Sequence, residues 1–117
     1  MALAVNQQTD MTAMVAQAVI DNYPAGAVRF SDQTTPAGTV PVLRIDDADR
    51  AEVIVPASIP LTAVGPALAN AMLPSDVWII VAAERMGAAH RALRGTGFRL
   101  QPWWEDGRIQ FGRPERS

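Results

Sequence analysis

The spacing of apolar residues along the chain predicts three helices and six strands. Apolar side chains recur every three or four positions, which places them on one face of a helix, over residues 10–23, 58–73 and 83–94. Short runs rich in β-branched and aromatic residues predict strands at 27–30, 40–45, 51–55, 77–82, 98–104 and 108–111. Residues 31–39 carry Asp, Thr, Pro and Gly and are expected to form a loop. The element order is therefore α-β-β-β-α-β-α-β-β.

This order predicts an α/β fold with a mixed sheet. Residues 77–82, Val-Trp-Ile-Ile-Val-Ala, are all apolar, which is typical of a central strand buried on both faces of a parallel sheet. A polar turn at 46–50 joins two earlier strands, so the first three strands are expected to form an antiparallel meander. The sheet is expected to end in a C-terminal hairpin and to carry helices on both faces. Gly65-Pro66 is expected to kink or break the second helix.

Length and composition are typical of one small domain. The chain has 117 residues, of which 49% are hydrophobic, enough to bury a sizeable core. Residues 1–8 and 113–117 are expected to be flexible or extended ends. The N-terminus has neither a basic segment nor a long apolar run, so we expect a cytoplasmic protein without a signal peptide or membrane span. Arginine without lysine, together with abundant alanine, is typical of a bacterial protein from a GC-rich genome.

Missing residue types exclude several kinds of chemistry. The chain has ten Arg and no Lys, a single His and no Cys. A P-loop and a Schiff-base enzyme both need a lysine, whereas thiol catalysis and cysteine zinc sites need a thiolate. We therefore expect no cofactor and no activity of these classes.

Charge is unevenly distributed along the chain, although the net charge is only −2. Residues 1–84 carry three Arg and nine acidic residues, whereas residues 85–117 carry seven Arg and three acidic residues. A basic C-terminal third can meet an acidic protein surface or phosphates. The negative net charge of the whole chain favours a protein partner over nucleic acid, because the acidic residues before position 85 would repel a polyanion.

The C-terminal hairpin carries the main candidate binding surface. Asp106-Gly107 predicts a two-residue turn, which would place Trp104 on the core face with Ile109 and Phe111. Trp103 would then share the opposite face with polar neighbours. An aromatic ring among arginines can anchor a protein interface or stack a base, unless a helix covers it as part of the core. The candidate binding residues are Trp103, Arg99, Gln101, Arg108 and Gln110, with Arg91 and Arg94 from the preceding helix.

Two further groups carry candidate chemistry. Asp46, Asp47, Asp49 and Glu52 lie within seven residues and are weak candidates for a magnesium or calcium site. Their spacing differs from that of a calcium-binding loop, and a solvated hairpin turn accounts for them equally well. His90 is the one residue suited to proton transfer near neutral pH, but a half-buried helix histidine is the simpler interpretation.

The C-terminal half resembles the restriction-endonuclease-like superfamily. Ser75-Asp-Val-Trp-Ile-Ile-Val-Ala with the Ala-rich helix after it, and Phe98-Arg-Leu-Gln with Asp106-Gly-Arg-Ile, are similar to that fold's fourth strand and terminal hairpin. The resemblance implies an acid on the second strand and an acid-x-Lys motif on the third, which hold a catalytic metal. Pro41, Ile54 and Pro56 stand at these three positions. Shifting the alignment brings in Glu52 but leaves Ile54 at the lysine position, so nuclease activity is not expected.

These observations favour a non-catalytic binding or assembly module that meets a protein partner or a second copy of itself. A nucleic-acid-binding accessory module on a degenerate nuclease-like fold is the first alternative. A small metal-dependent hydrolase built on the acidic turn is the second. A fold alone does not decide among them, because function depends on the site.

Overall fold

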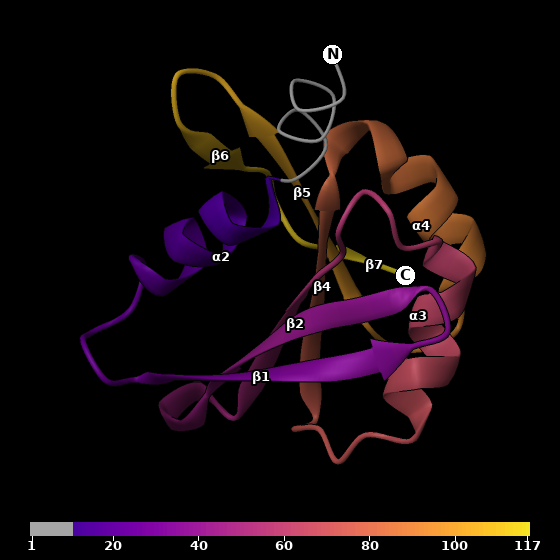
Figure 1. The fold of residues 1–117 in the computed structure, drawn as a ribbon, viewed down its shortest axis with the longest axis horizontal. Coiled ribbons are helices and arrows are strands. Elements are labelled where there is room, and N and C mark those ends of the chain that lie inside the picture. The colour runs from indigo at the N-terminus through magenta and orange to yellow at the C-terminus, as the bar shows by residue number, and fades with distance from the viewer. Residues whose placement is uncertain (1–10) are drawn as a thin grey trace.

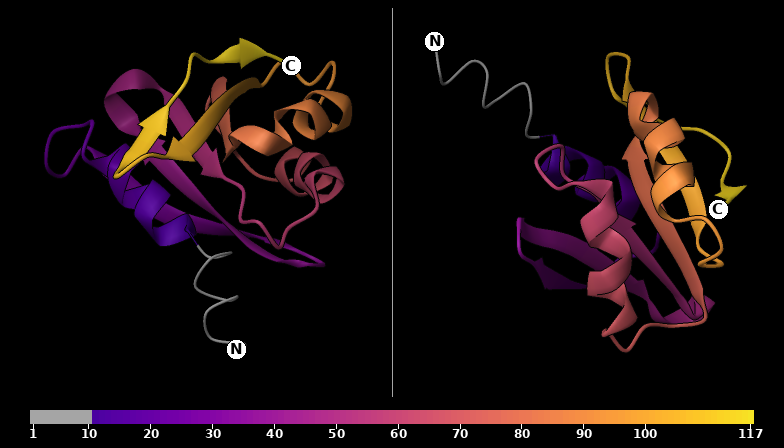
Figure 2. Two further views of the ribbon diagram at one scale, coloured as in Figure 1. Left: turned by 90° about the horizontal axis from the view of Figure 1, so that it is seen from above. Right: turned by 90° about the vertical axis from the view of Figure 1, so that its right-hand side faces the viewer.

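The computed structural model describes residues 11–117 and shows a β-sheet with helices on both faces (Figure 1). Helix α2 (Thr12–Ile20) packs on one face, and helices α3 (Leu61–Ala69) and α4 (Met86–Ala92) pack on the other (Figure 2). Short 3-10 turns lie at Asp46–Ala48 and Ala83–Arg85. The predicted flexible end at residues 1–8 lies outside the described residues.

The seven-stranded sheet has the order β1-β2-β3-β4-β5-β6, with β7 also pairing with β5. Pairing is antiparallel from β1 to β3, parallel from β3 to β5, and antiparallel for β6 and β7 against β5. This confirms the predicted α/β fold and element order, although strand β7 in the C-terminal segment was not predicted. The strands are β1 (Val28–Thr35), β2 (Gly38–Ile45), β3 (Arg50–Ile54), β4 (Asp76–Ala82), β5 (Arg99–Glu105), β6 (Ile109–Phe111) and β7 (Glu115–Arg116).

The central strands contribute to two hydrophobic cores, one under each helical layer. Alternate residues of a strand point to opposite faces. Val53, Ile79 and Leu100 therefore pack with α3 and α4, whereas Ile54 and Ile80 pack with α2. Both Ile79 and Ile80 are fully buried, which confirms that β4 is covered on both faces.

Two predicted element boundaries were wrong. The predicted loop at 31–39 is mostly strand, because β1 continues to Thr35 and β2 starts at Gly38. Residues of an edge strand can be polar on both faces, since pairing with β2 holds the strand in place. Helix α3 also continues through Gly65 and Pro66, so of the predicted kink or break the break does not occur. Burial of Val64 and Leu68 against the sheet stabilises the helix, although Pro66 has no N–H to donate to the helical hydrogen-bond pattern.

The predicted register of the C-terminal hairpin was also wrong. A two-residue turn would pair Glu105 with Arg108, but Glu105 pairs with Ile109 across a three-residue loop. Gly107 adopts φ 71°, and the Asp106 N–H donates to the Arg108 carbonyl at 2.9 Å. A one-residue change of register turns every side chain of a strand to the other face. Ile109 and Phe111 therefore lie with Trp103 against the α2 core instead of with Trp104.

Gly112, directly after β6, tests the packing of this hairpin. A Cβ atom at Gly112 would lie 2.7 Å from Cγ of Pro102 and 3.3 Å from Cζ3 of Trp104. We expect Gly112→Ala to lower the free energy of unfolding by about 1 kcal/mol, the low end for overpacking because the site is at the sheet edge. Urea denaturation measures the change. The matched variant Gly65→Ala should stabilise by about 0.5–1 kcal/mol as a helix substitution, because its Cβ makes an ordinary 3.5 Å contact with Leu93. Equal effects of the two variants would contradict this account.

Candidate functional site

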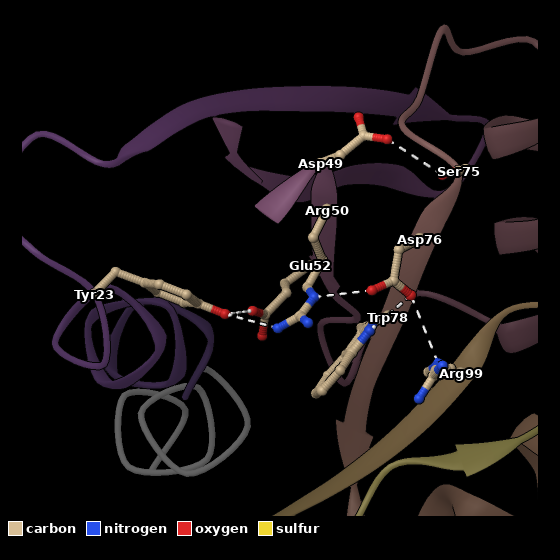
Figure 3. A network of polar contacts seen from close by, with 8 residues as sticks. All are labelled: Tyr23, Asp49, Arg50, Glu52, Ser75, Asp76, Trp78 and Arg99. Carbon is tan, nitrogen blue, oxygen red and sulfur yellow. Dashed lines mark hydrogen bonds and ion pairs between the residues drawn. The ribbon is translucent and has the colours of Figure 1, made fainter. Parts of the chain in front are cut away.

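A network of polar side chains lies on the α2 face, where strands β3, β4 and β5 begin (Figure 3). The sheet register places Arg50 beside Asp76 and Trp78 between Glu52 and Arg99. Tyr23 reaches the same place from the segment after α2. We call this group the Asp76 network; it consists of Tyr23, Arg50, Glu52, Asp76, Trp78 and Arg99.

Asp76 is the common acceptor of the network. Its carboxylate accepts hydrogen bonds from Arg50 Nε at 3.0 Å and Trp78 Nε1 at 2.9 Å, and Arg99 Nε lies 3.6 Å from it. The Arg50 guanidinium also lies 4.1 Å from the centroid of the Trp78 ring, a cation–π contact. These contacts tie the starts of three neighbouring strands together.

Glu52 is a buried carboxyl group at the other end of the network. Its side chain is only 4% exposed, and the Tyr23 hydroxyl donates to Oε2. Arg50 Nη1 donates in turn to the Tyr23 oxygen at 3.2 Å. Burial raises the pKa of Glu52, while the hydrogen bond from Tyr23 and the charge of Arg50 oppose the rise. Burial and the neighbouring Glu52 raise the pKa of Tyr23, which therefore remains a proton donor at neutral pH.

The position of the network favours a structural role for most of its members. Ligands of open α/β sheets bind outside the carboxyl ends of the parallel strands. Arg50, Asp76 and Arg99 stand at the amino ends of theirs. Their charges are also directed at one another. One small pocket of about 100 Å³ adjoins the network. It is lined by Val19, Asn22, Tyr23, Glu52, Trp78, Gln101 and Phe111.

The predicted binding residues of the hairpin are divided between the two faces of the sheet. Trp103 is half-buried in the α2 core, and it shares that face with Arg99 and Gln101 as predicted. Gln110 pairs with Trp104 and points the other way, while Arg108 lies in the loop. The exposed tryptophan of the pair is Trp104, at 41%.

The two predicted helix arginines do not join the Trp103 face. Arg91 and Arg94 are exposed, Arg91 within α4 and Arg94 just after it, and α4 covers the face opposite α2 (Figure 2). Arg99 and Gln101 are also engaged, Arg99 with Asp76 and Gln101 with the Gly112 carbonyl at 2.9 Å. The structure therefore does not assemble these residues into one continuous patch.

The acidic candidates for a metal site do not converge. Asp46 forms a two-pronged contact with Arg29, with both distances 2.9 Å, and Asp49 accepts from Ser75 at 3.2 Å. Asp47 is exposed, and Glu52 is buried beneath α2. Among residues 11–117, no group of three or more His, Cys, Asp or Glu side chains is placed to hold a metal ion.

The remaining candidates also occupy separate places. His90 Nε2 lies 2.9 Å from Glu115 Oε1, so it links α4 to β7. Ile54 is buried beside α2, Pro41 lies on β2, and Pro56 follows β3. These three residues stand where the family resemblance would place its metal-binding acids and lysine.

Sequence reasoning missed four members of the Asp76 network: Tyr23, Arg50, Asp76 and Trp78. One signal was available. Arg50 and Glu52 are charged residues at alternate positions of β3, a strand that the element order places inside the sheet. Charges on one face of an interior strand need partners close by; Asp76 on β4 is the partner of Arg50, and Tyr23 is the partner of Glu52.

The two edges of the sheet differ in how far other strands cover them. The outer edge of β5 is covered by β6 over Trp103–Glu105 and by β7 over Arg99–Leu100. Strand β1 forms the opposite edge and pairs with no second strand in the described part of the chain, although its last residue, Thr35, is buried. Phe30, the third of these eight residues, is 58% exposed.

Comparison with known proteins gives no match to a family, to a curated protein or to a solved structure. The resemblance to the restriction-endonuclease-like superfamily therefore stays a prediction. Across residues 11–117, every helix is too short to cross a membrane.

Proposed function

We propose that the protein is a non-catalytic assembly module that pairs with a second copy of itself through strand β1. The observation that carries the proposal is the free edge of β1 with its exposed phenylalanine. A long edge strand presents unpaired backbone groups to another strand unless Pro, charged side chains, a bulge or a covering element block it. Val28–Thr35 contains no Pro, and its two charged residues are Arg29 and Asp32.

Antiparallel pairing of two β1 strands around Phe30 is compatible with the side chains of the strand. A two-fold axis at Phe30 places the two phenyl rings opposite each other, a favourable cross-strand pair. Arg29 then lies opposite Ser31, and Val28 opposite Asp32, so like charges do not meet. The exposed Arg29 is also paired with Asp46 within its own chain.

The structure gives less support to a catalytic or nucleic-acid function. The carboxylates of the Asp76 network are engaged by Tyr23, Arg50 and Trp78. One arginine of the basic C-terminal third is already engaged within the chain. Arg85 donates to the carbonyls of Pro56 at 3.0 Å and Ile59 at 2.7 Å. A steep fall of oligonucleotide affinity with salt, near −0.9 per duplex phosphate contacted on a log–log scale, would favour the nucleic-acid alternative.

Sedimentation equilibrium of the full chain tests the proposed dimer. A single strand pair buries less than the roughly 1,200 Å² of a standard interface, so we expect a concentration-dependent dimer with a dissociation constant of about 10–100 μM. Phe30→Lys places a charge on the edge and should weaken the dimer at least about tenfold. Met14→Lys on α2 makes the same change at a similarly exposed site, 53% against 58%, and should leave the dimer unchanged.

Two results would overturn the dimer proposal. One is a strict monomer at about 1 mM, well above the expected dissociation constant. The other is equal weakening by Phe30→Lys and Met14→Lys, which would show a general charge effect. A dimer lost on Trp104→Ala but kept in Phe30→Lys would place the interface at the C-terminal hairpin and contradict the β1 assignment.

A further inference from the structure

The small pocket beside Glu52 combines aromatic walls with a buried carboxyl group. An inference drawn from it does not depend on the proposed dimer. Three of its seven lining residues are aromatic: Tyr23, Trp78 and Phe111. Its volume of about 100 Å³ is about three times the share of one water molecule in the liquid. The pocket therefore has room for a small polar head group.

Two carbonyl or carboxylate oxygens of these walls are available acceptors, and the Asn22 amide offers both a donor and an acceptor. Tyr23 donates to Glu52 Oε2, which leaves Oε1 of the same carboxylate as a second acceptor. Gln101 donates its amide to the Gly112 carbonyl, which leaves its side-chain carbonyl oxygen as an acceptor. The Trp78 N–H is used by Asp76. A ligand that pairs with Glu52 and the Gln101 carbonyl must bring donors.

We propose that this pocket binds a primary ammonium group carried on a short alkyl chain. The ammonium supplies three N–H donors and a positive charge to Glu52 Oε1 and the Gln101 carbonyl. The faces of aromatic rings add cation–π attraction. Val19 and Phe111 provide apolar contact for the methylene groups.

The two arginines of the Asp76 network do not compete for this position. Arg50 and Arg99 do not line the pocket; both contact Asp76, and Arg50 also donates to the Tyr23 oxygen (Figure 3). With Glu52 ionised, the four charged side chains Arg50, Arg99, Asp76 and Glu52 sum to zero. Of these four, Glu52 is the charge that lines the pocket, so its carboxylate decides which ion binds.

Binding should depend on pH through Glu52. The groups that act on its carboxyl are Tyr23 from the segment after α2, Arg50 on its own strand and Asp76 on β4. Because burial raises the pKa of Glu52, its carboxyl group keeps the proton to a higher pH than a free glutamate does. Affinity for the ammonium should therefore rise as the pH rises through the pKa of Glu52 in the folded chain and level off above it.

Titration of the full chain with n-butylammonium, followed by ¹H–¹⁵N NMR, tests the site. We expect saturable shifts at the Trp78 indole and Gln101 side-chain amide signals, with a dissociation constant of about 1–10 mM. n-Butanol has the same chain without the charge, and tetramethylammonium has the charge without N–H donors, so both should bind at least about tenfold more weakly. Tighter binding of putrescine would indicate a free diamine as ligand, and tighter binding of Nα-acetyl-lysinamide a lysine side chain; either result supports the site.

Variants separate the pocket from general charge effects. Glu52→Gln keeps an acceptor for Tyr23 and should weaken n-butylammonium binding at least about tenfold at neutral pH. Glu105→Gln removes the same charge from an exposed position of β5 and should leave binding unchanged. Phe111→Leu removes one aromatic wall and leaves Glu52 unchanged. It should weaken binding severalfold, while the ¹H–¹⁵N NMR spectrum of the variant remains that of a folded protein.

The proposal is overturned by the absence of saturable shifts at about 100 mM n-butylammonium, far above the expected dissociation constant. Equal binding of n-butanol would also overturn it, as would unchanged affinity in Glu52→Gln. These outcomes leave the dimer proposal untouched, because β1 does not line the pocket.

Discussion

Replacing Asp76 with alanine is expected to lower the free energy of unfolding by about 3 kcal/mol at neutral pH. The substitution removes the acceptor of the Arg50 Nε and Trp78 Nε1 hydrogen bonds and the ion pair with Arg99. Leaving partly buried charged and indole donors without a partner costs more than the net value of the bonds themselves. Side-chain exposure of 25% for Arg50 and 31% for Asp76 screens the charge, which holds the effect at the low end of the range for breaking a buried ion pair.

Urea denaturation of the variants checks this value. Asp76→Asn retains an acceptor for the Trp78 indole and should lose about half as much stability as Asp76→Ala. Asp47→Ala removes an exposed acidic residue from the turn before β3 and should change stability by less than about 0.5 kcal/mol. If Asp76→Ala were as stable as Asp47→Ala, the network would not tie the three strands together in the way described.

The elements of this fold could be predicted where burial controls the residue pattern. Strand β4 is apolar at nearly every position because α2 covers one of its faces and α3 with α4 the other. Strand β1 gave only a weak pattern, since its polar residues Ser31 and Asp32 lie on an exposed edge. Its extension to Thr35 follows from backbone pairing with β2, which apolar periodicity does not report.

The length of the hairpin loop, two or three residues, decides on which face of the sheet the side chains after it lie. Asp106-Gly107 suits a two-residue turn, but the observed loop also includes Arg108. That single residue moves Phe111 to the α2 face, where it lines the pocket beside Glu52. The sequence-based binding surface therefore combined side chains that the sheet separates.

Local patterns do not show which side chains the site brings together. Tyr23 and Glu52 are 29 positions apart, and Arg50 and Asp76 are 26 apart. They meet because three strands align in one register and because α2 ends beside β3. Glu52 was identified as part of an acidic turn and as a motif acid in a shifted alignment, although its side chain belongs to the interior.

Replacing Tyr23 with phenylalanine is expected to lower the free energy of unfolding by about 2 kcal/mol near pH 7 and by about 1 kcal/mol near pH 4. The hydroxyl donates to Glu52 and accepts from Arg50. A hydrogen bond to an ionised carboxylate is worth about 1.5–3 kcal/mol, against about 1 kcal/mol for a neutral pair. The cost of the substitution therefore depends on the protonation state of Glu52.

The direction of this pH dependence follows from the pKa of Glu52. Burial raises that pKa in the folded chain above its ordinary value of 4.5, so the native state holds the proton more tightly than the unfolded state. The contribution of Glu52 to stability is fully present below pH 4.5 and is lost as the pH rises through its folded pKa. Tyr23 limits that loss, since its hydrogen bond lowers the pKa of Glu52. In Tyr23→Phe the pKa of Glu52 rises further, and stability falls more steeply with pH.

A double-mutant cycle with Glu52→Gln isolates this coupling. In the Glu52→Gln background position 52 does not titrate, so Tyr23→Phe should cost about 1 kcal/mol at both pH values. Urea denaturation of the four proteins near pH 4 and pH 7 gives the coupling energy at each pH. The same cost of Tyr23→Phe at both pH values in the Glu52 background would contradict the assignment, because the phenol would then stabilise the fold by packing and not by holding the buried carboxylate.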